Sequence, residues 1–137
     1  MAPSQQEIAS IFEKIRADGG DFLNHLDPDV KLEVMGHDHA TRKVHKSHQA
    51  MTEEIFAQFA FLDGNSFKSE PRQVIGGGSS PWASVELILT GKSQKGKAFN
   101  HECVCIVHFN EGGKIDEARA YFDSSHLDDH FTHHRQG

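Results

Sequence analysis

The stretch that most constrains the fold is residues 97–123, where side chains of different character alternate along the chain. Phe99, His101, Cys103, Cys105, Val107 and Phe109 share one side, and Asn100, Glu102, Val104, Ile106 and His108 share the other. A period of two over this many residues predicts a long strand. Residues 110–113 then predict a hairpin turn, because adjacent glycines supply the positive φ angles of a tight return. With Ile115–Asp123 as the returning strand, the C-terminal third is expected to be one antiparallel hairpin on which the rest packs.

The preceding residues predict helices first and strands afterwards. Ser4 and Glu7 have the spacing of a capping box, which predicts a helix with an apolar stripe that ends at Gly19–Gly20. Pro71 is expected at a sheet edge or a bulge because it cannot donate a ladder hydrogen bond. The other expected elements are a helical turn over 21–26 ended by Pro28, a strand over 30–35, a polar loop over 37–46, a helix over 47–62, a strand over 65–75, a glycine-rich loop over 76–81 and a strand over 82–90.

Size and composition exclude several classes of protein. A chain of 137 residues without a linker is expected to form one domain, 1–137, with residues 124–137 as a tail or lid. A net charge of −6 with no basic stripe argues against nucleic acid, and no apolar run is long enough to cross a membrane. Cys103 and Cys105 are two apart on one strand and cannot comfortably bridge, which predicts reduced thiols in a cytoplasmic protein.

Two segments carry a family resemblance. Phe22–Gly36 and Gly113–Asp123, with the strand around Val85 and Glu86 between them, resemble the SnoaL-like polyketide cyclase group of the NTF2-like superfamily, which is related to ketosteroid isomerase and limonene epoxide hydrolase. The resemblance implies an α+β fold: a cone-shaped barrel in which a curved, mostly antiparallel sheet wraps N-terminal helices around an apolar pocket. It also implies a homodimer. Members include cyclases, isomerases, dehydratases, epoxide hydrolases and binding modules, so the fold does not fix the activity.

One departure from the family bears on the reaction. Limonene epoxide hydrolases carry an acid before the tyrosine of the last strand and an Arg-x-Asp pair on an earlier strand. The residue before Tyr121 is Ala120, and Ser84 and Glu86 fall near the positions of the arginine and aspartate. Hydrolysis by that arrangement is disfavoured, and an epoxide hydrolase with a rearranged site stays open as an alternative.

The same alignment predicts the lining of the pocket. With Ala120 in the pocket, the pleat directs Ala118 and Phe122 inward as well. His101 and Glu86 become an acid–base pair on adjacent strands, since a carboxylate that holds one imidazole nitrogen leaves the other to move a proton. The competing interpretation is a buried pair that only satisfies its own hydrogen bonds. The full set expected to bind substrate is Ser84, Ile88, Cys103, Cys105, Ala118, Ala120, Phe122, His37 and His39.

The other histidines do not define a metal site. His37 and His39 lie in a loop, where they are expected to donate hydrogen bonds to substrate, and no third ligand has recognisable spacing. The histidines of the tail are read as part of a charged segment. Neither a metal nor a cofactor is expected.

The sequence therefore predicts a cofactor-free enzyme of secondary metabolism, of the isomerase, cyclase or dehydratase type, acting on a hydrophobic cyclic metabolite such as a polyketide or terpenoid. A non-catalytic small-molecule-binding protein of the same shape is the alternative. Val104 and Ile106 place apolar surface on the outer side of the sheet. Such surface needs cover, which predicts a homodimer through the outer sheet face.

Overall fold

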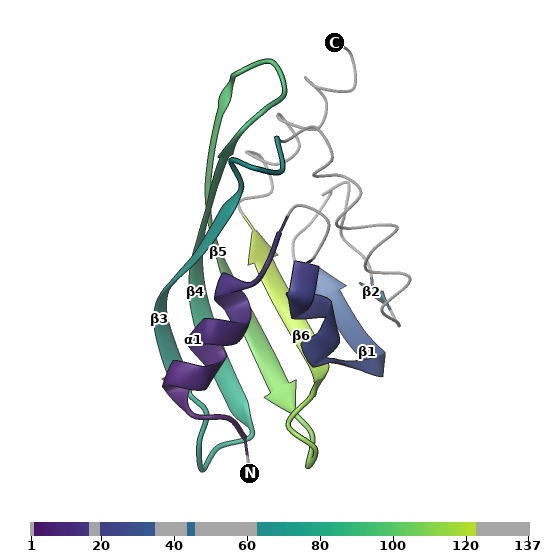
Figure 1. The fold of residues 1–137 in the computed structure, drawn as a ribbon. Coiled ribbons are helices and arrows are strands. Elements are labelled where there is room, and N and C mark those ends of the chain that lie inside the picture. The colour runs from purple at the N-terminus through teal and green to yellow at the C-terminus, as the bar shows by residue number, and fades with distance from the viewer. Residues whose placement is uncertain (1, 17–19, 35–43, 46–62, 123–137) are drawn as a thin grey trace.

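The computed structural model describes residues 2–16, 20–34, 44–45 and 63–122. The elements are α1 (Gln5–Glu13), the 3₁₀ helix η1 (Gly20–His25), and the strands β1 (Leu26–Val34), β2 (Val44–His45), β3 (Lys68–Gly76), β4 (Trp82–Lys92), β5 (Ala98–Phe109) and β6 (Ile115–Phe122). The strands form one curved sheet in the order β2-β1-β6-β5-β4-β3, and α1 and η1 lie over its concave side (Figure 1).

The sheet is mostly antiparallel, as expected. β3, β4, β5 and β6 form a meander of antiparallel neighbours, whereas β1 runs parallel to β6. The α+β class and the curved sheet are confirmed. Within the described chain β2 and β3 are separate edges, so the sheet curls without closing into a barrel. Val44 and His45, expected in a loop, form the short strand β2 against β1.

Helix α1 begins as predicted and ends early. The Ser4 hydroxyl accepts from the Glu7 backbone N–H, and the Glu7 carboxylate accepts from the Ser4 N–H, both at 3.1 Å. The helix ends at Glu13 rather than at Gly19–Gly20. The Arg16 guanidinium donates to the backbone oxygens of Glu13 and Ile15, which satisfies carbonyls that the helix leaves without partners.

The two prolines of the sheet lie where its ladders are irregular. Pro28, expected to end the helical turn, lies inside β1, whose pairing with β6 shifts register between Leu26 and Lys31. Pro71 lies on edge strand β3 at a shift between Pro71 and Gln73, which confirms the prediction. A residue without an N–H is tolerated at both places because the regular ladder is already interrupted.

The predicted turns are present. In the β5–β6 hairpin the Asn110 side-chain oxygen accepts from the N–H groups of Gly112 and Lys114, and Gly113 has a φ of 79°. The glycine-rich turn before β4 contacts α1. A Cβ on Gly77 would approach Ile8 Cδ1 to 2.6 Å, so this glycine lets the helix lie close to the turn.

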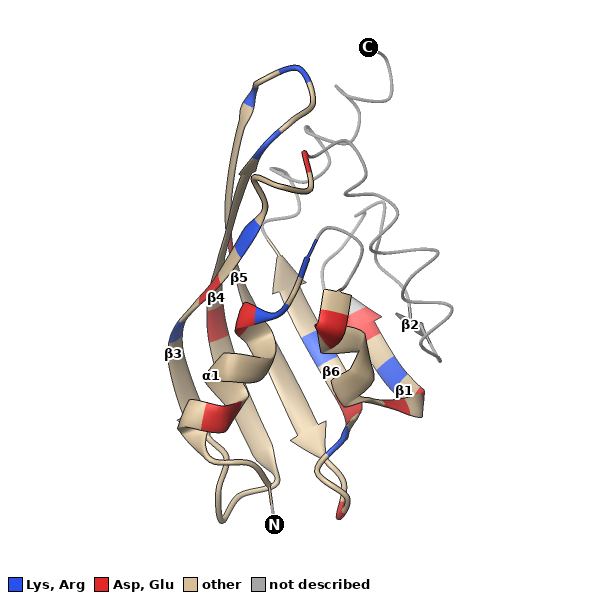
Figure 2. Cartoon of the chain, viewed as in Figure 1, with Lys and Arg blue, Asp and Glu red and all other residues tan. Residues whose placement is uncertain are grey.

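The core lies between α1 and the concave face of the sheet. Ile8, Phe12, Val30, Val85 and Ile115 are almost completely buried there. Both signs of charge are distributed along the strands and turns, and the described residues form no continuous basic stripe (Figure 2). In the part of the chain that the structure describes, no helix is long and apolar enough to cross a membrane.

Several predictions concern segments outside the described residues. These are the helix over 47–62, the loop histidines His37 and His39, and the tail over 124–137.

Candidate functional site

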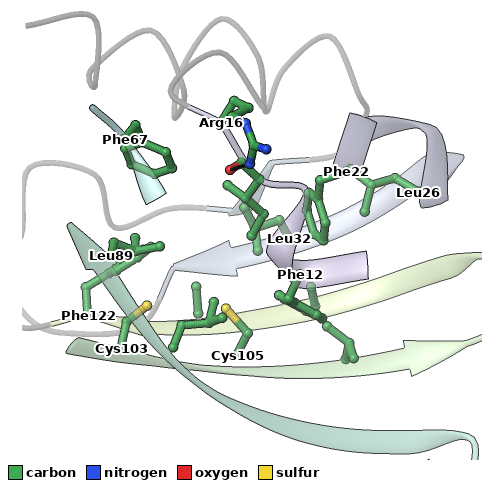
Figure 3. Close-up of a pocket in the computed structure, with 15 residues that line it drawn as sticks. Phe12, Arg16, Phe22, Leu26, Leu32, Phe67, Leu89, Cys103, Cys105 and Phe122 are labelled. Atoms are coloured by element: carbon green, nitrogen blue, oxygen red, sulfur yellow. Dashed lines mark hydrogen bonds between the residues drawn. The ribbon is translucent and has the colours of Figure 1, made fainter. Parts of the chain in front are cut away.

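A cavity of about 80 Å³ lies between the two helical segments and the concave face of the sheet (Figure 3). Leu87, Leu89, Cys103, Cys105, Ala120 and Phe122 are among the sheet residues that line it. Phe12 of α1 and Phe22 of η1 form a wall, with ring centroids 5.1 Å apart. The lining is almost entirely apolar, so the cavity suits an apolar group from which water is excluded.

The inward orientation predicted for the β5 and β6 residues is present in the structure, and their contact with substrate stays a prediction. Cys103 and Cys105 line the cavity, as do Ala118, Ala120 and Phe122. The register explains the match, because Cys103 lies opposite Phe122 and Cys105 lies opposite Ala120. Directly opposed residues of an antiparallel pair point to the same face, and the small side chains of Ala120 and Cys105 leave space above the sheet.

The prediction for β4 is wrong. Glu86 lies opposite Val104 and not beside His101, which is opposite Leu89. The expected inward residues Ser84, Glu86 and Ile88 therefore occupy the outer face, and the residues that point inward are Ala83, Val85, Leu87 and Leu89. A shift of one residue moves every side chain of a strand to the other face. Neither Ser84 nor Ile88 lines the cavity, and the expected His101–Glu86 pair does not form.

Glu86 instead belongs to a charged group on the outer face. The Arg72 guanidinium lies 3.9 Å from the Glu86 carboxylate and 3.8 Å from the Glu102 carboxylate. The Arg72 side chain is 55% exposed, so solvent weakens both ion pairs.

His101 occupies the inner face as predicted and is 2% exposed. Its ring is stacked on Phe99 with centroids 5.9 Å apart and is tilted against Phe122 at 5.6 Å. Phe122 also lines the cavity, whereas His101 is not among the cavity-lining residues. His101 is therefore one side chain away from the cavity, with Phe122 as the contact between them.

The two thiols are neighbours in the cavity wall. The pKa of Cys103 is raised well above its usual value by a hydrogen bond between the Cys103 and Cys105 side chains and by burial. A raised pKa keeps Cys103 protonated near pH 7, and a protonated thiol is a poor nucleophile. This environment is typical of a small apolar wall residue and not of a nucleophile.

Arg16 was missed by the sequence predictions. It is exposed, follows α1, and is the only charged side chain among the described residues that line the cavity. Figure 3 shows its guanidinium near Phe22, on the side of the cavity away from Cys103 and Cys105. No sequence pattern marked it, because a single arginine after a helix is usually solvated.

The described residues do not bring metal ligands together. Among them, no three His, Cys, Asp or Glu side chains are grouped so that they could hold a metal ion. His37 and His39 lie outside the described residues, so their expected contact with substrate remains a prediction.

Comparison with known sequences finds a fungal relative. The dimerizing cyclase phiC of a fungal species is 25% identical over 124 residues, which is 90% of this chain and 55% of the relative. The chain therefore spans about half the length of that protein. No protein-family model matches the chain.

Solved structures give closer agreement in shape than in sequence. The BvnE pinacolase of Penicillium brevicompactum superposes with a TM-score of 0.73 at 11% identity, covering 94% of this chain and 86% of that one. A putative SnoaL-like polyketide cyclase from Jannaschia sp. CCS1 gives a TM-score of 0.66 at 12% identity, covering 90% of each chain. Other neighbours are described as NTF2-like proteins. At such low identity these matches establish the fold alone.

Proposed function

Since this chain has the NTF2-like fold in the form found in SnoaL-like polyketide cyclases, we propose that it is an enzyme for proton-transfer chemistry on a hydrophobic small molecule. The reaction class is cyclisation, isomerisation or dehydration in secondary metabolism, which needs no cofactor. The observation that carries the proposal is the apolar cavity with a buried histidine behind its wall. The relative named a cyclase and the neighbour named a pinacolase support the same class.

His101 is the residue we assign to proton transfer. A neutral imidazole accepts a proton and its conjugate acid returns one, so a single histidine serves both halves of an isomerisation. In the structure Phe122 lies between His101 and the cavity, so a rotation of the Phe122 side chain is required for contact with substrate. The apolar wall contributes by excluding water from the reacting centre, where electrostatic interactions become stronger.

A second function is a small-molecule-binding protein without turnover. It is favoured by the apolar lining of the cavity and by the position of His101 behind Phe122. An epoxide hydrolase of the three-residue type finds no support, because Ser84 and Glu86 lie on the outer face and Ala120 carries no acid.

Incubation of the protein with polyketide and terpenoid intermediates, epoxides included, tests this proposal by mass spectrometry. A product of unchanged mass indicates an isomerase or cyclase, and loss of one water indicates a dehydratase. Gain of one water contradicts the proposal, and ligand retained without product supports the binding protein.

His101→Gln should reduce turnover by about 10²-fold or more, the usual contribution of general acid–base catalysis. The control His108→Gln, on the outer face, should retain activity, and thermal unfolding verifies that both variants are folded.

We also propose that two copies associate through the outer sheet face. Val104 and Ile106 are half-buried there, and Trp82 and Tyr121 are 37% and 41% exposed. Both described helical segments lie on the concave side, so we assign a second copy of the chain to cover this apolar surface (Figure 1).

Light scattering after size exclusion should give twice the chain mass. Val104→Lys should give a monomer, and the control Asn100→Lys, an exposed position on the same face, should not; a monomeric wild type would reject the assembly.

We assign the protein to the cytoplasm on the basis of its thiols. Cys103 and Cys105 are both free in the structure. Free, adjacent thiols are stable in a reducing compartment. Alkylation of freshly lysed cells should label both cysteines, and an intramolecular or mixed disulfide in that sample would contradict the assignment.

A further inference from the structure

Cys103 and Cys105 line the cavity but have no part in the proton transfer assigned to His101. We propose that the two thiols together form a binding site for a small trivalent arsenical, in which one arsenic atom bonds to both sulfur atoms. This inference concerns a second chemistry of the cavity and does not depend on turnover. It rests on the direction of the two side chains, on their apolar surroundings and on the size of the cavity.

The direction of the two side chains follows from their spacing. Residues two apart on a strand point to the same face, and Cys103 and Cys105 are two apart on β5. Their partners on β6, Phe122 and Ala120, also line the cavity. Figure 3 shows both sulfur atoms on the cavity side of the strand, each inclined toward the other, and a hydrogen bond joins the two side chains. One ligand atom above the strand can therefore reach both sulfurs.

The apolar surroundings of the thiols select the kind of ligand. Zinc in structural sites takes four ligands, whereas the described residues contain no group of three His, Cys, Asp or Glu side chains that could hold a metal ion. Copper(I) bound by two thiolates would carry a net negative charge, and burial of an unpaired charge is costly. A methylarsenic group bound by two thiolates is neutral. The cavity therefore favours trivalent arsenic over these metal ions.

The size of the cavity limits the organic substituent on the arsenic. The cavity volume is about 80 Å³, against the ~150 Å³ of an engineered cavity that binds benzene. A methyl group with one arsenic atom is smaller than a benzene ring, whereas a phenyl group on arsenic needs the larger space. Methylarsonous acid is therefore the probe that fits, and phenylarsine oxide is the matched probe that is too large.

Binding is a condensation that balances without a redox partner. Methylarsonous acid carries two hydroxyl groups on trivalent arsenic. Each thiol forms one S–As bond, one As–O bond breaks, and the thiol proton leaves with the hydroxyl group as water. Two waters are released in total, and arsenic remains trivalent. Because the protonated Cys103 thiol attacks slowly, binding is measured after equilibration and not as a rate.

The second S–As bond forms within one molecule. Once one cysteine holds the arsenic, the other thiol is at a high effective concentration, which raises the overall affinity by about 10²- to 10⁴-fold. The chain contains two cysteines in all, so substitution of either one leaves a single S–As bond and removes that gain.

Native mass spectrometry of the whole chain with methylarsonous acid, in competition with dithiothreitol at pH 7.5, tests the inference. The wild type should gain one methylarsenic unit and lose two hydrogens, as a product with two S–As bonds requires. Cys103→Ala and Cys105→Ala should each bind at least about 10²-fold more weakly. Val104→Ala is the matched control, because Val104 lies between the two cysteines in the chain and faces outward. It should keep the wild-type affinity.

Thermal unfolding separates a folded site from a merely reactive sequence. A ligand that binds the native state raises the melting temperature, so methylarsonous acid should raise it in the wild type and in Val104→Ala. Phenylarsine oxide should bind the wild type more weakly than the methyl compound. The proposal is overturned by a wild-type adduct that retains one hydroxyl group, by a lowered melting temperature, or by equal or tighter binding of the phenyl compound. These wild-type measurements decide the matter even where a variant does not fold, and a folded single-cysteine variant with wild-type affinity overturns it as well.

Discussion

The two faces of the sheet differ although the same strands build both. On β4 the residues Val85 and Leu87 are at most 3% exposed on the concave face, whereas their neighbours Glu86 and Ile88 are partly exposed on the outer face. The concave face surrounds a cavity whose lining from the sheet is apolar apart from two cysteines. The outer face carries both apolar and charged side chains. Among the charged ones, Arg72 lies between Glu86 and Glu102.

This difference shows that the role of a polar residue on a strand depends on which face of the sheet its side chain occupies. A carboxylate on the concave face would have lost its hydration and required a partner, so Glu86 there would have been a strong catalytic candidate. On the outer face the same carboxylate pairs with an exposed arginine and remains near water. His101 lies on the concave face and is buried, so it remains the catalytic candidate of the site.

The largest expected effect comes from truncating neighbouring residues on the two faces. Leu87→Ala should lower the free energy of unfolding by about 2–5 kcal/mol, because it leaves a cavity in the packed core. Ile88→Ala, one residue along, should cost about 1 kcal/mol or less, as for other surface substitutions. Urea denaturation followed by circular dichroism measures both. Equal losses would mean that the outer face is packed as tightly as the core.

A smaller effect is expected from pH on the concave face. Because the folded pKa of Cys103 is raised, its contribution to stability is fully present below the unfolded thiol pKa and is lost as pH rises through the folded pKa. Urea denaturation from pH 7 to pH 10.5 should therefore show a decline above the ordinary thiol range, and Cys103→Ala should show less of it. The same decline in both proteins would assign it to other groups. Cys103 should also react slowly with a thiol reagent at pH 7.

The smallest effect is expected for the charged group on the outer face. Arg72→Gln should change the free energy of unfolding by about 0.5 kcal/mol or less, because exposed ion pairs contribute little. The measurement is again urea denaturation, at low and at high salt. A loss above 1 kcal/mol would show that Arg72 is shielded from water, as it would be beneath a second copy of the chain.

About half of the candidate site was predictable from local patterns. The lining residues of β5 and β6 follow from the alternation of 99–109 and from a turn that sets the register of one hairpin. The inward residues of β4 also had a signal, since Val85, Leu87 and Leu89 alternate as apolar residues. The family resemblance predicts the opposite face of β4, because such distant relatives do not fix the register, and the apolar Ile88 on the other face makes the alternation less clear.

Other parts depend on segments that are far apart in the chain. The parallel pairing of β1 with β6 joins residues that no turn connects, so no local pattern announces it. Arg16 lines the cavity because its carbon stem packs against Gly20, where a Cβ would lie 2.9 Å from Arg16 Cγ, and because the concave sheet lies opposite. Pro28 lies in a strand because β1 and β6 are irregular at that point.

The amino-acid sequence by itself determined the capped start of α1, the helical turn before β1, the β3–β6 meander and the inner face of the last hairpin. These features depend on hydrogen bonds and periodicities within a few residues. Only the tertiary structure decided which face of β4 meets the cavity and that His101 is separated from the cavity by Phe122. Those outcomes depend on register and packing between distant segments, which local sequence does not encode.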